Sequence, residues 1–174
     1  MPIQIDETLR DAAIDRRTKF WGKYRGIVSD VLSGSDLGKV TVKVPEIYGE
    51  DVTMTAWPCV PFAGPSHGFV AVPEVGDGVW IEFEGGNPSQ PIWVGCWWAQ
   101  GDMPAPSDTN VRTWITSKGL KIILDDGQSQ LSLEHPQGAS IVLTGTDITL
   151  SIGATSLKLD ASGITTSGNV QVGA

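Results

Sequence analysis

Residues 119–172 read GLKIILDDGQSQLSLEHPQGASIVLTGTDITLSIGATSLKLDASGITTSGNVQV, and this stretch decides the fold of the last third of the chain. Apolar residues recur in pairs two positions apart, separated by Ser, Thr, Gly, Asp and Asn. The pairs are Ile122/Leu124, Leu131/Leu133, Ile141/Leu143, Ile148/Leu150, Leu157/Leu159 and Val170/Val172, and Ile164 stands alone. Because side chains two apart share a face of a strand, each pair predicts a short strand and each polar stretch a turn. Strands of about three to five residues cannot bury a face alone. The pattern therefore predicts a β-helix or β-prism whose rungs stack on one another and on other chains.

The charge of the chain argues against several partners. The 174 residues carry a net charge of −8, and no basic block occurs. A chain of this kind does not favour a nucleic-acid duplex or an anionic membrane. No run of about 18 apolar residues predicts a transmembrane helix, and the acidic first residues are unlike a signal peptide. These features predict a protein made and folded in the cytoplasm.

Cys59 and Cys96 lie in apolar runs, which predicts buried free thiols, and whether they are close in space stays open.

Four segments are predicted from composition and periodicity. They are a helical segment at 1–21, a β-barrel at 22–98, a linker at 99–110 and the rungs at 111–174. The only predicted helix spans 7–20, where Leu9, Ala13 and Phe20 fall on a thin apolar face that suits a partner-ordered helix. The barrel strands are predicted at 24–31, 37–45, 53–60, 68–72, 79–84 and 92–98, with Val40, Val42, Val44, Val79, Ile81 and Phe83 at alternating positions.

No residue pattern predicts catalysis or a metal. His67 and His135 have no Cys, His or carboxylate at ligand spacing. Glu82 and Glu84 are predicted on one face of a strand, where a carboxylate pair is more often a solvated surface than an acid–base pair. Asp125-Asp126-Gly127 predicts a turn because the other ligands of a calcium loop are missing. We expect no enzyme activity, no cofactor and no metal.

The tryptophans leave two interpretations open. Five of the seven lie between Trp57 and Trp98. They could fill a small barrel and an interface between subunits, or they could stack bases or sugars. Lys and Arg are sparse around them, which favours the core and interface over a groove for single strands.

Three motifs of the barrel occur in a recognisable order. They are Gly38-Lys39-Val40 through Val44-Pro45, Pro73-Glu74-Val75-Gly76-Asp77, and Gly86-Asn87-Pro88 through Pro91-Ile92-Trp93-Val94-Gly95. In order and spacing they resemble the phage baseplate assembly protein V/VgrG spike family, and the similarity continues through residues 116–122 and 125–126, so that it covers about residues 20–174. Gly78 stands where an acid is common in that family, and Asn87 where Asp is common.

The resemblance implies an all-β fold: an N-terminal oligonucleotide/oligosaccharide-binding (OB) barrel followed by an intertwined trimeric β-helix (β-prism), with a short N-terminal helix. It does not imply hydrolase activity, because no lysozyme-like domain separates barrel and rungs. The last residues lack the paired-histidine metal motif of self-sharpened tips, which implies a separate PAAR-like tip protein.

We therefore predict the central spike of a contractile phage tail or phage-tail-like injection system. It would be a homotrimer that assembles in the cytoplasm, docks on a baseplate hub, becomes part of the particle and pierces the target envelope mechanically. The predicted trimer core comprises Ile141, Leu143, Ile148, Leu150, Leu157, Leu159, Ile164, Val170 and Val172. Val170 and Val172 would contact the tip protein, and Leu9, Ala13 and Phe20 the hub. The alternative is an OB module that binds single-stranded nucleic acid or glycan, and a hydrolase is a third possibility without supporting residues.

Overall fold

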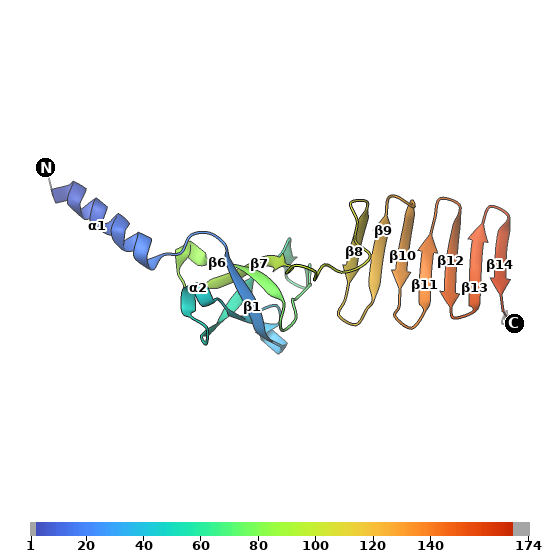
Figure 1. The fold of residues 1–174 in the computed structure, drawn as a ribbon, viewed down its shortest axis with the longest axis horizontal. Helices are drawn as coiled ribbons and strands as arrows, with labels where there is room; N and C mark the ends of the chain where they lie inside the picture. Colours follow the sequence, from blue (N-terminus) through green and yellow to red (C-terminus); the bar gives the residue numbers. More distant parts are fainter. Residues whose placement is uncertain (1–2, 169–174) are drawn as a thin grey trace. The chain divides into compact units, whose positions relative to one another are not determined.

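A computed structural model describes residues 3–168 and divides the chain into two compact units, Met1–Gly101 and Asp102–Ala174 (Figure 1). The first unit contains a closed five-stranded barrel in the order β1-β2-β3-β7-β6. Its strands are β1 (Tyr24–Val31), β2 (Val40–Lys43), β3 (Thr53–Pro58), β6 (Gly78–Phe83) and β7 (Pro91–Trp97). Neighbours pair antiparallel except β3 and β7, which pair in parallel. This exchange of the fourth and fifth strands is the topology expected for an OB-like barrel.

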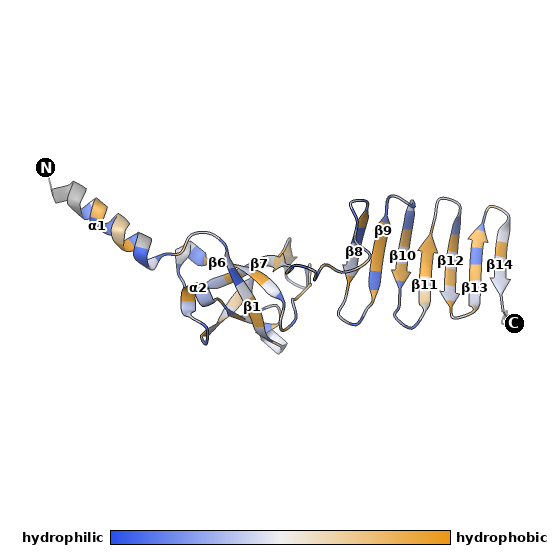
Figure 2. Cartoon of the chain, viewed as in Figure 1, coloured by the Kyte–Doolittle hydropathy of each residue, from blue (hydrophilic) through white to orange (hydrophobic). Residues whose placement is uncertain are grey.

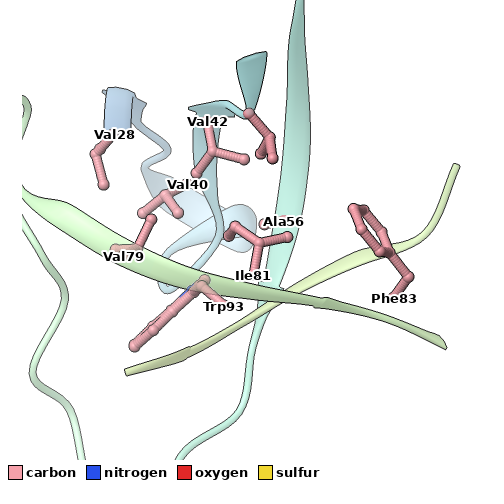
Figure 3. Close-up of a cluster of buried hydrophobic side chains, with 9 residues drawn as sticks. Val28, Val40, Val42, Ala56, Val79, Ile81, Phe83 and Trp93 are labelled. Atoms are coloured by element: carbon pink, nitrogen blue, oxygen red, sulfur yellow. The ribbon is translucent and has the colours of Figure 1, made fainter. Parts of the chain in front are cut away.

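The core of the barrel follows the predicted alternation of apolar residues. Val40, Val42 and Val44 are fully buried, as are Val79 and Ile81. Figure 3 shows most of the core side chains, with Ala56 and Trp93 beside them. The period-two reading of these strands is therefore confirmed.

Short elements connect the barrel strands, and one predicted strand is absent. The short elements are η1 (Gly34–Asp36), α2 (Pro45–Tyr48), β4 (Ala63–Gly64), β5 (His67–Gly68) and η2 (Glu84–Gly86). The strand predicted at 68–72 was wrong, because only Gly68 of this segment pairs, in the small β4–β5 hairpin. The five strands already close the barrel, so no free edge remains for a sixth strand.

The strand directions give the barrel two different ends. β1, β3 and β7 run one way, and β2 and β6 run the other. The connections 32–39 and 59–77, together with the chain after Trp97, therefore lie at one end, which we call the exit end. The connections 44–52 and 84–90 and the start of β1 lie at the other. We call it the aromatic end, because Phe20, Tyr24, Tyr48 and Phe83 pack there with ring centroids 5.5–6.2 Å apart.

The N-terminal helix is shifted from its predicted bounds. Helix α1 spans Ile3–Thr18, where 7–20 was predicted. Leu9 is 64% exposed, and Ala13 is exposed too. Phe20 lies beyond the helix and not on its apolar face. Its ring packs on Tyr24 and Phe83, and its backbone N–H donates to the carbonyl oxygen of Gly86 at 2.9 Å. No described helix is long and apolar enough to cross a membrane.

The second unit is one antiparallel sheet of seven strands. They pair in chain order: β8 (Val111–Ile115), β9 (Lys121–Asp125), β10 (Gln130–Glu134), β11 (Ala139–Leu143), β12 (Asp147–Ile152), β13 (Thr155–Asp160) and β14 (Gly163–Ser167). The short strands and turns are as predicted. The strands of different chains were expected to intertwine. In the structure, each strand instead forms its ladder with the next strand of the same chain. The tight turns between consecutive strands make this local pairing the shortest connection.

Candidate functional site

The register of the seven-stranded sheet aligns the apolar pairs in two rows that cross it. Leu131 pairs with both Leu124 and Leu143, and Leu150 pairs with both Ile141 and Leu157. The first row is Leu124, Leu131, Leu143, Ile148, Leu159 and Ile164, and the second is Ile122, Leu133, Ile141, Leu150 and Leu157. Paired residues of adjacent strands share a face, so both rows lie on one face, which we call the apolar face. Hydrophobic residues recur on each strand from β9 to β13 (Figure 2).

The apolar face is open to solvent in the single chain. Exposed fractions in the two rows include 37% for Leu143 and 45% for Leu124, and Ile164 reaches 68%. A hollow of about 580 Å³ lies on this face, bordered by Trp114, Leu120, Ile122, Leu133, Ile141, Leu150 and Ile152. A contiguous exposed apolar surface of this kind marks an interaction site.

The structure brings together all the predicted trimer-core residues that it describes. Ile141, Leu143, Ile148, Leu150, Leu157, Leu159 and Ile164 all belong to the two rows. Val170 and Val172 lie outside the described residues. The predicted set lacked the four row members on β9 and β10, although their apolar pairs were recognised as strands. It also lacked Trp114 and Ile152, which are 53% and 74% exposed. Trp114 pairs with Ile122 of the second row, so the alternation of residues along β8 places it on the apolar face.

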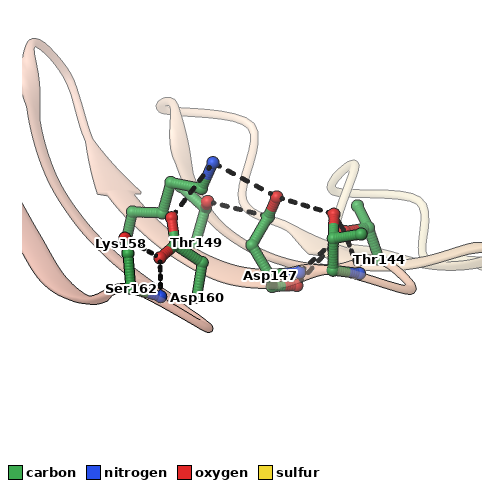
Figure 4. Close-up of polar contacts among 7 residues, drawn as sticks. Thr144, Asp147, Thr149, Lys158, Asp160 and Ser162 are labelled. Carbon is green, nitrogen blue, oxygen red and sulfur yellow. Dashed lines mark hydrogen bonds and ion pairs between the residues drawn. The ribbon is translucent and has the colours of Figure 1, made fainter.

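The opposite face of the sheet is polar on β12 and β13, whereas on β9 it carries Ile123, which is 7% exposed. The Lys158 Nζ lies 3.3 Å from Asp147 Oδ2 and 3.7 Å from Asp160 Oδ2, so one cation bridges two neighbouring strands (Figure 4). The Thr149 hydroxyl donates to Asp147 at 3.4 Å. Hydrogen bonds from Ser162, and then Lys158, lower the pKa of Asp160. The polar groups of β12 and β13 therefore pair with one another on this face, whereas the two rows of the apolar face are left exposed in the single chain.

The candidate chemical residues occupy turns and surface pairs. Glu82 on β6 accepts a hydrogen bond from Lys23 at 2.6 Å. Glu84 was predicted on the same strand, but it lies in η2. The two carboxylates therefore do not form a pair on one strand. The Nδ1 atom of His135 accepts from the N–H of Gln137 at 3.2 Å within a turn. Among the described residues, no group of three or more Cys, His, Asp and Glu could hold a metal ion.

The tryptophans divide between the core and the surface. Trp93 is 5% exposed, and its indole N–H donates to the carbonyl oxygen of Gly38 at 2.9 Å. The Arg25 guanidinium lies between two rings, 5.5 Å from the centre of Trp80 and 5.0 Å from that of Trp97. Trp57 is exposed, but Lys39 Nζ lies 3.7 Å from its ring centre. A base stacking on that face of the ring would have to displace this ammonium group.

Both cysteines are exposed free thiols, so the prediction that they are buried was wrong. Trp93 takes an inward position of β7, whereas Cys96 follows the register shift near the end of that strand and is exposed. The apolar runs around the cysteines contain buried residues, but not every residue of such a run is buried.

Two comparisons with known proteins bear on the barrel. Residues 24–98 match the family described as the type VI secretion system/phage-baseplate injector OB domain. Comparison with curated proteins returned no match. The matched range begins at the first residue of β1 and ends one residue after β7, so it coincides with the closed barrel.

Proposed function

Because residues 24–98 match the injector OB domain of phage baseplates and type VI secretion systems, we propose that this chain is the central spike of such a machine. The barrel would dock on the baseplate hub, and the sheet unit would associate with its copies into a needle that pierces the target envelope. One observation carries the proposal beyond the family: the apolar face, which a single chain leaves exposed.

The strand length favours three copies. Strands of five or six residues are about 17–20 Å long. In a three-sided prism with sides of that length, the axis lies about 5–6 Å from each sheet. Packed sheets are about 10 Å apart, so side chains of one sheet reach about 5 Å toward the middle. Leucine and isoleucine side chains from three sheets would therefore meet at the axis.

Other assemblies fit less well. A four-sided prism would place the axis roughly 9 Å from each sheet and leave a hollow centre. A sandwich of two sheets would need apolar residues along the full strand, because the ends of each strand also face the partner sheet. Here most strands contribute two row positions, and polar residues flank them at both ends of β9, β10 and β13. Because strands pair within the chain, each copy would form one whole side of the prism.

The two ends of the spike would have different partners. Helix α1 exposes Leu9 and Ala13, and a hub surface could cover them. Phe20 would act by anchoring the segment after the helix to the barrel. At the other end, β14 is the edge strand among the strands that the structure describes, and edge strands expose unpaired backbone groups. A PAAR-like tip protein, with Val170 and Val172 as contacts, is proposed from the family resemblance. The spike would be a structural part of the particle, without enzyme activity.

Two adjacent residues of β12 test the proposal. Leu150 lies on the apolar face and Ser151 on the polar face. Light scattering of the wild-type protein at micromolar concentration should give the mass of a trimer. Leu150→Asp would bring three carboxylates to one axis and should abolish the trimer, because desolvating unpaired charges is costly. Ser151→Asp should leave the trimer intact. A monomeric wild-type protein, or a trimer that tolerates Leu150→Asp, would refute the proposal.

A further inference from the structure

A second exposed apolar surface lies on the barrel. Residues 52–73 contain no Asp, Glu, Lys or Arg, and no other stretch of the chain this long is free of charge. Its first part forms β3, and its second part begins the connection to β6. Residues 61–71 are all exposed, including Phe62 at 57% and Val70 at 70%. We call residues 59–72 the charge-free loop.

A groove lies beside the charge-free loop. It has a volume of about 480 Å³, and its lining includes Leu37, Pro58, Val60, Phe69, Val72 and Trp93. Leu37 comes from the connection 32–39 and is 62% exposed. The surface therefore offers projecting apolar side chains and an apolar hollow close together, so one copy of it could receive side chains from another.

We propose that the charge-free loop and its groove dock against the barrel of a second copy of this chain. Net charge is the first argument: identical copies that each carry −8 repel one another, so contacts between them are favoured where charge is absent.

The position of the surface is the second argument, and it rests on the proposed assembly of the sheets. Leu37 and the charge-free loop lie at the exit end, where the chain leaves the barrel for the sheet unit. The segment from Trp97 to Val111 can span at most about 50 Å. Copies held together by their apolar faces therefore keep their exit ends within reach of one another. The N-terminal helix connects to the opposite, aromatic end, which leaves the exit end for contacts among the copies.

Hydrogen exchange of the full-length protein tests this docking without any substitution. In the single chain, the amides of Val70 and Ala71 donate no hydrogen bond to described residues. Exposed amides of this kind exchange at close to the rate of an unstructured peptide. If a neighbouring barrel covers the loop, these two amides should exchange at least about 10-fold more slowly in the wild-type assembly.

Two valine substitutions provide the specific and the control variant. Val70→Lys places an ammonium group on the proposed contact, and should return the exchange of Ala71 to the peptide rate while the mass stays that of the assembly. Val52→Lys is the matched control, because Val52 is 47% exposed in the same charge-free stretch but lies in the connection at the aromatic end. It should leave the protection of the loop unchanged.

Mass and exchange separate this inference from the proposed function. An assembly of the expected mass in which Val70 and Ala71 exchange freely overturns the barrel contact and leaves the needle standing. Protection that survives Val70→Lys also overturns it. A monomeric mass overturns the proposed function, and the barrel contact with it.

Discussion

Replacing Leu150 by alanine should reveal whether the apolar face is buried in an assembly. Leu150 lies in the second row between Ile141 and Leu157, and 43% of its surface is exposed in the single chain. If the single chain were the final state, truncating this partly buried side chain would cost about 1–2 kcal/mol of stability. If three faces meet, the side chain is fully buried, and Leu→Ala costs about 2–5 kcal/mol per chain. Because the substitution occurs three times around the axis, the assembly would lose roughly 6–15 kcal/mol.

Chemical unfolding at two protein concentrations distinguishes these magnitudes. For the wild-type protein the midpoint of the transition of the sheet unit should rise with concentration, because folding is coupled to association. Leu150→Ala should lower that midpoint strongly and make light scattering detect dissociated chains. Ser151→Ala is the matched control on the polar face, and should change stability by less than about 0.5 kcal/mol.

A wild-type midpoint that does not depend on concentration, together with a cost of only about 1–2 kcal/mol for Leu150→Ala, would refute burial of the apolar face in an assembly. Such a result would mean that the two rows remain half-exposed in the native protein. The apolar faces would then not meet in a three-sided core.

Four further predictions concern the barrel and its partners. Gly78→Ala should destabilise the barrel by about 1–3 kcal/mol, because a Cβ there would lie 2.6 Å from the Trp97 ring. Chemical unfolding followed by tryptophan fluorescence measures this loss, and adding Trp97→Leu should recover part of it. Burial raises the pKa of Tyr48 to about 12, so the stability that its neutral form provides is complete below pH 10 and is lost as the pH rises toward 12. Tyr48→Phe, which also removes the hydrogen bond to the Pro88 carbonyl, should flatten this alkaline dependence of the unfolding free energy. An unchanged pH profile would contradict the assignment. Deleting residues 1–18 should leave a folded protein of wild-type mass that assembles poorly into particles, whereas full assembly would exclude a docking role for α1. A single-stranded oligonucleotide should not bind at sub-micromolar concentration and physiological salt, given the net charge of −8; fluorescence anisotropy would detect such binding and would then favour the OB module that binds nucleic acid.

The strands could be predicted from the sequence because their signal is local. Val40, Val42 and Val44 alternate with polar residues, and this period of two is enough to place β2 and its inward face. The same holds for the apolar pairs of the sheet unit. Turn residues between the pairs, such as Asp125-Asp126-Gly127, set where each strand ends.

The partners of the strands could not be predicted in the same way. An apolar pair shows which face is buried, but it does not show whether the neighbouring strand belongs to the same chain or to another. The strand at 68–72 was predicted from local composition, while its absence depends on closure of the barrel by strands far apart in the sequence. Phe20 fits a helical spacing with Leu9 and Ala13, and only the aromatic cluster around Phe83 shows that it belongs to the barrel.

The in-chain pairing of the seven strands has a mechanical consequence. The backbone hydrogen bonds of the sheet point along the direction in which the strands stack, from β8 to β14. Compression along this direction presses neighbouring strands together, where their closely packed atoms resist it. Tension along it loads the ladders in series, so the weakest ladder opens first and the strands peel off one at a time. A needle built from such sheets would be stiff while it is driven forward, and could be unravelled by a steady pull on the last strand.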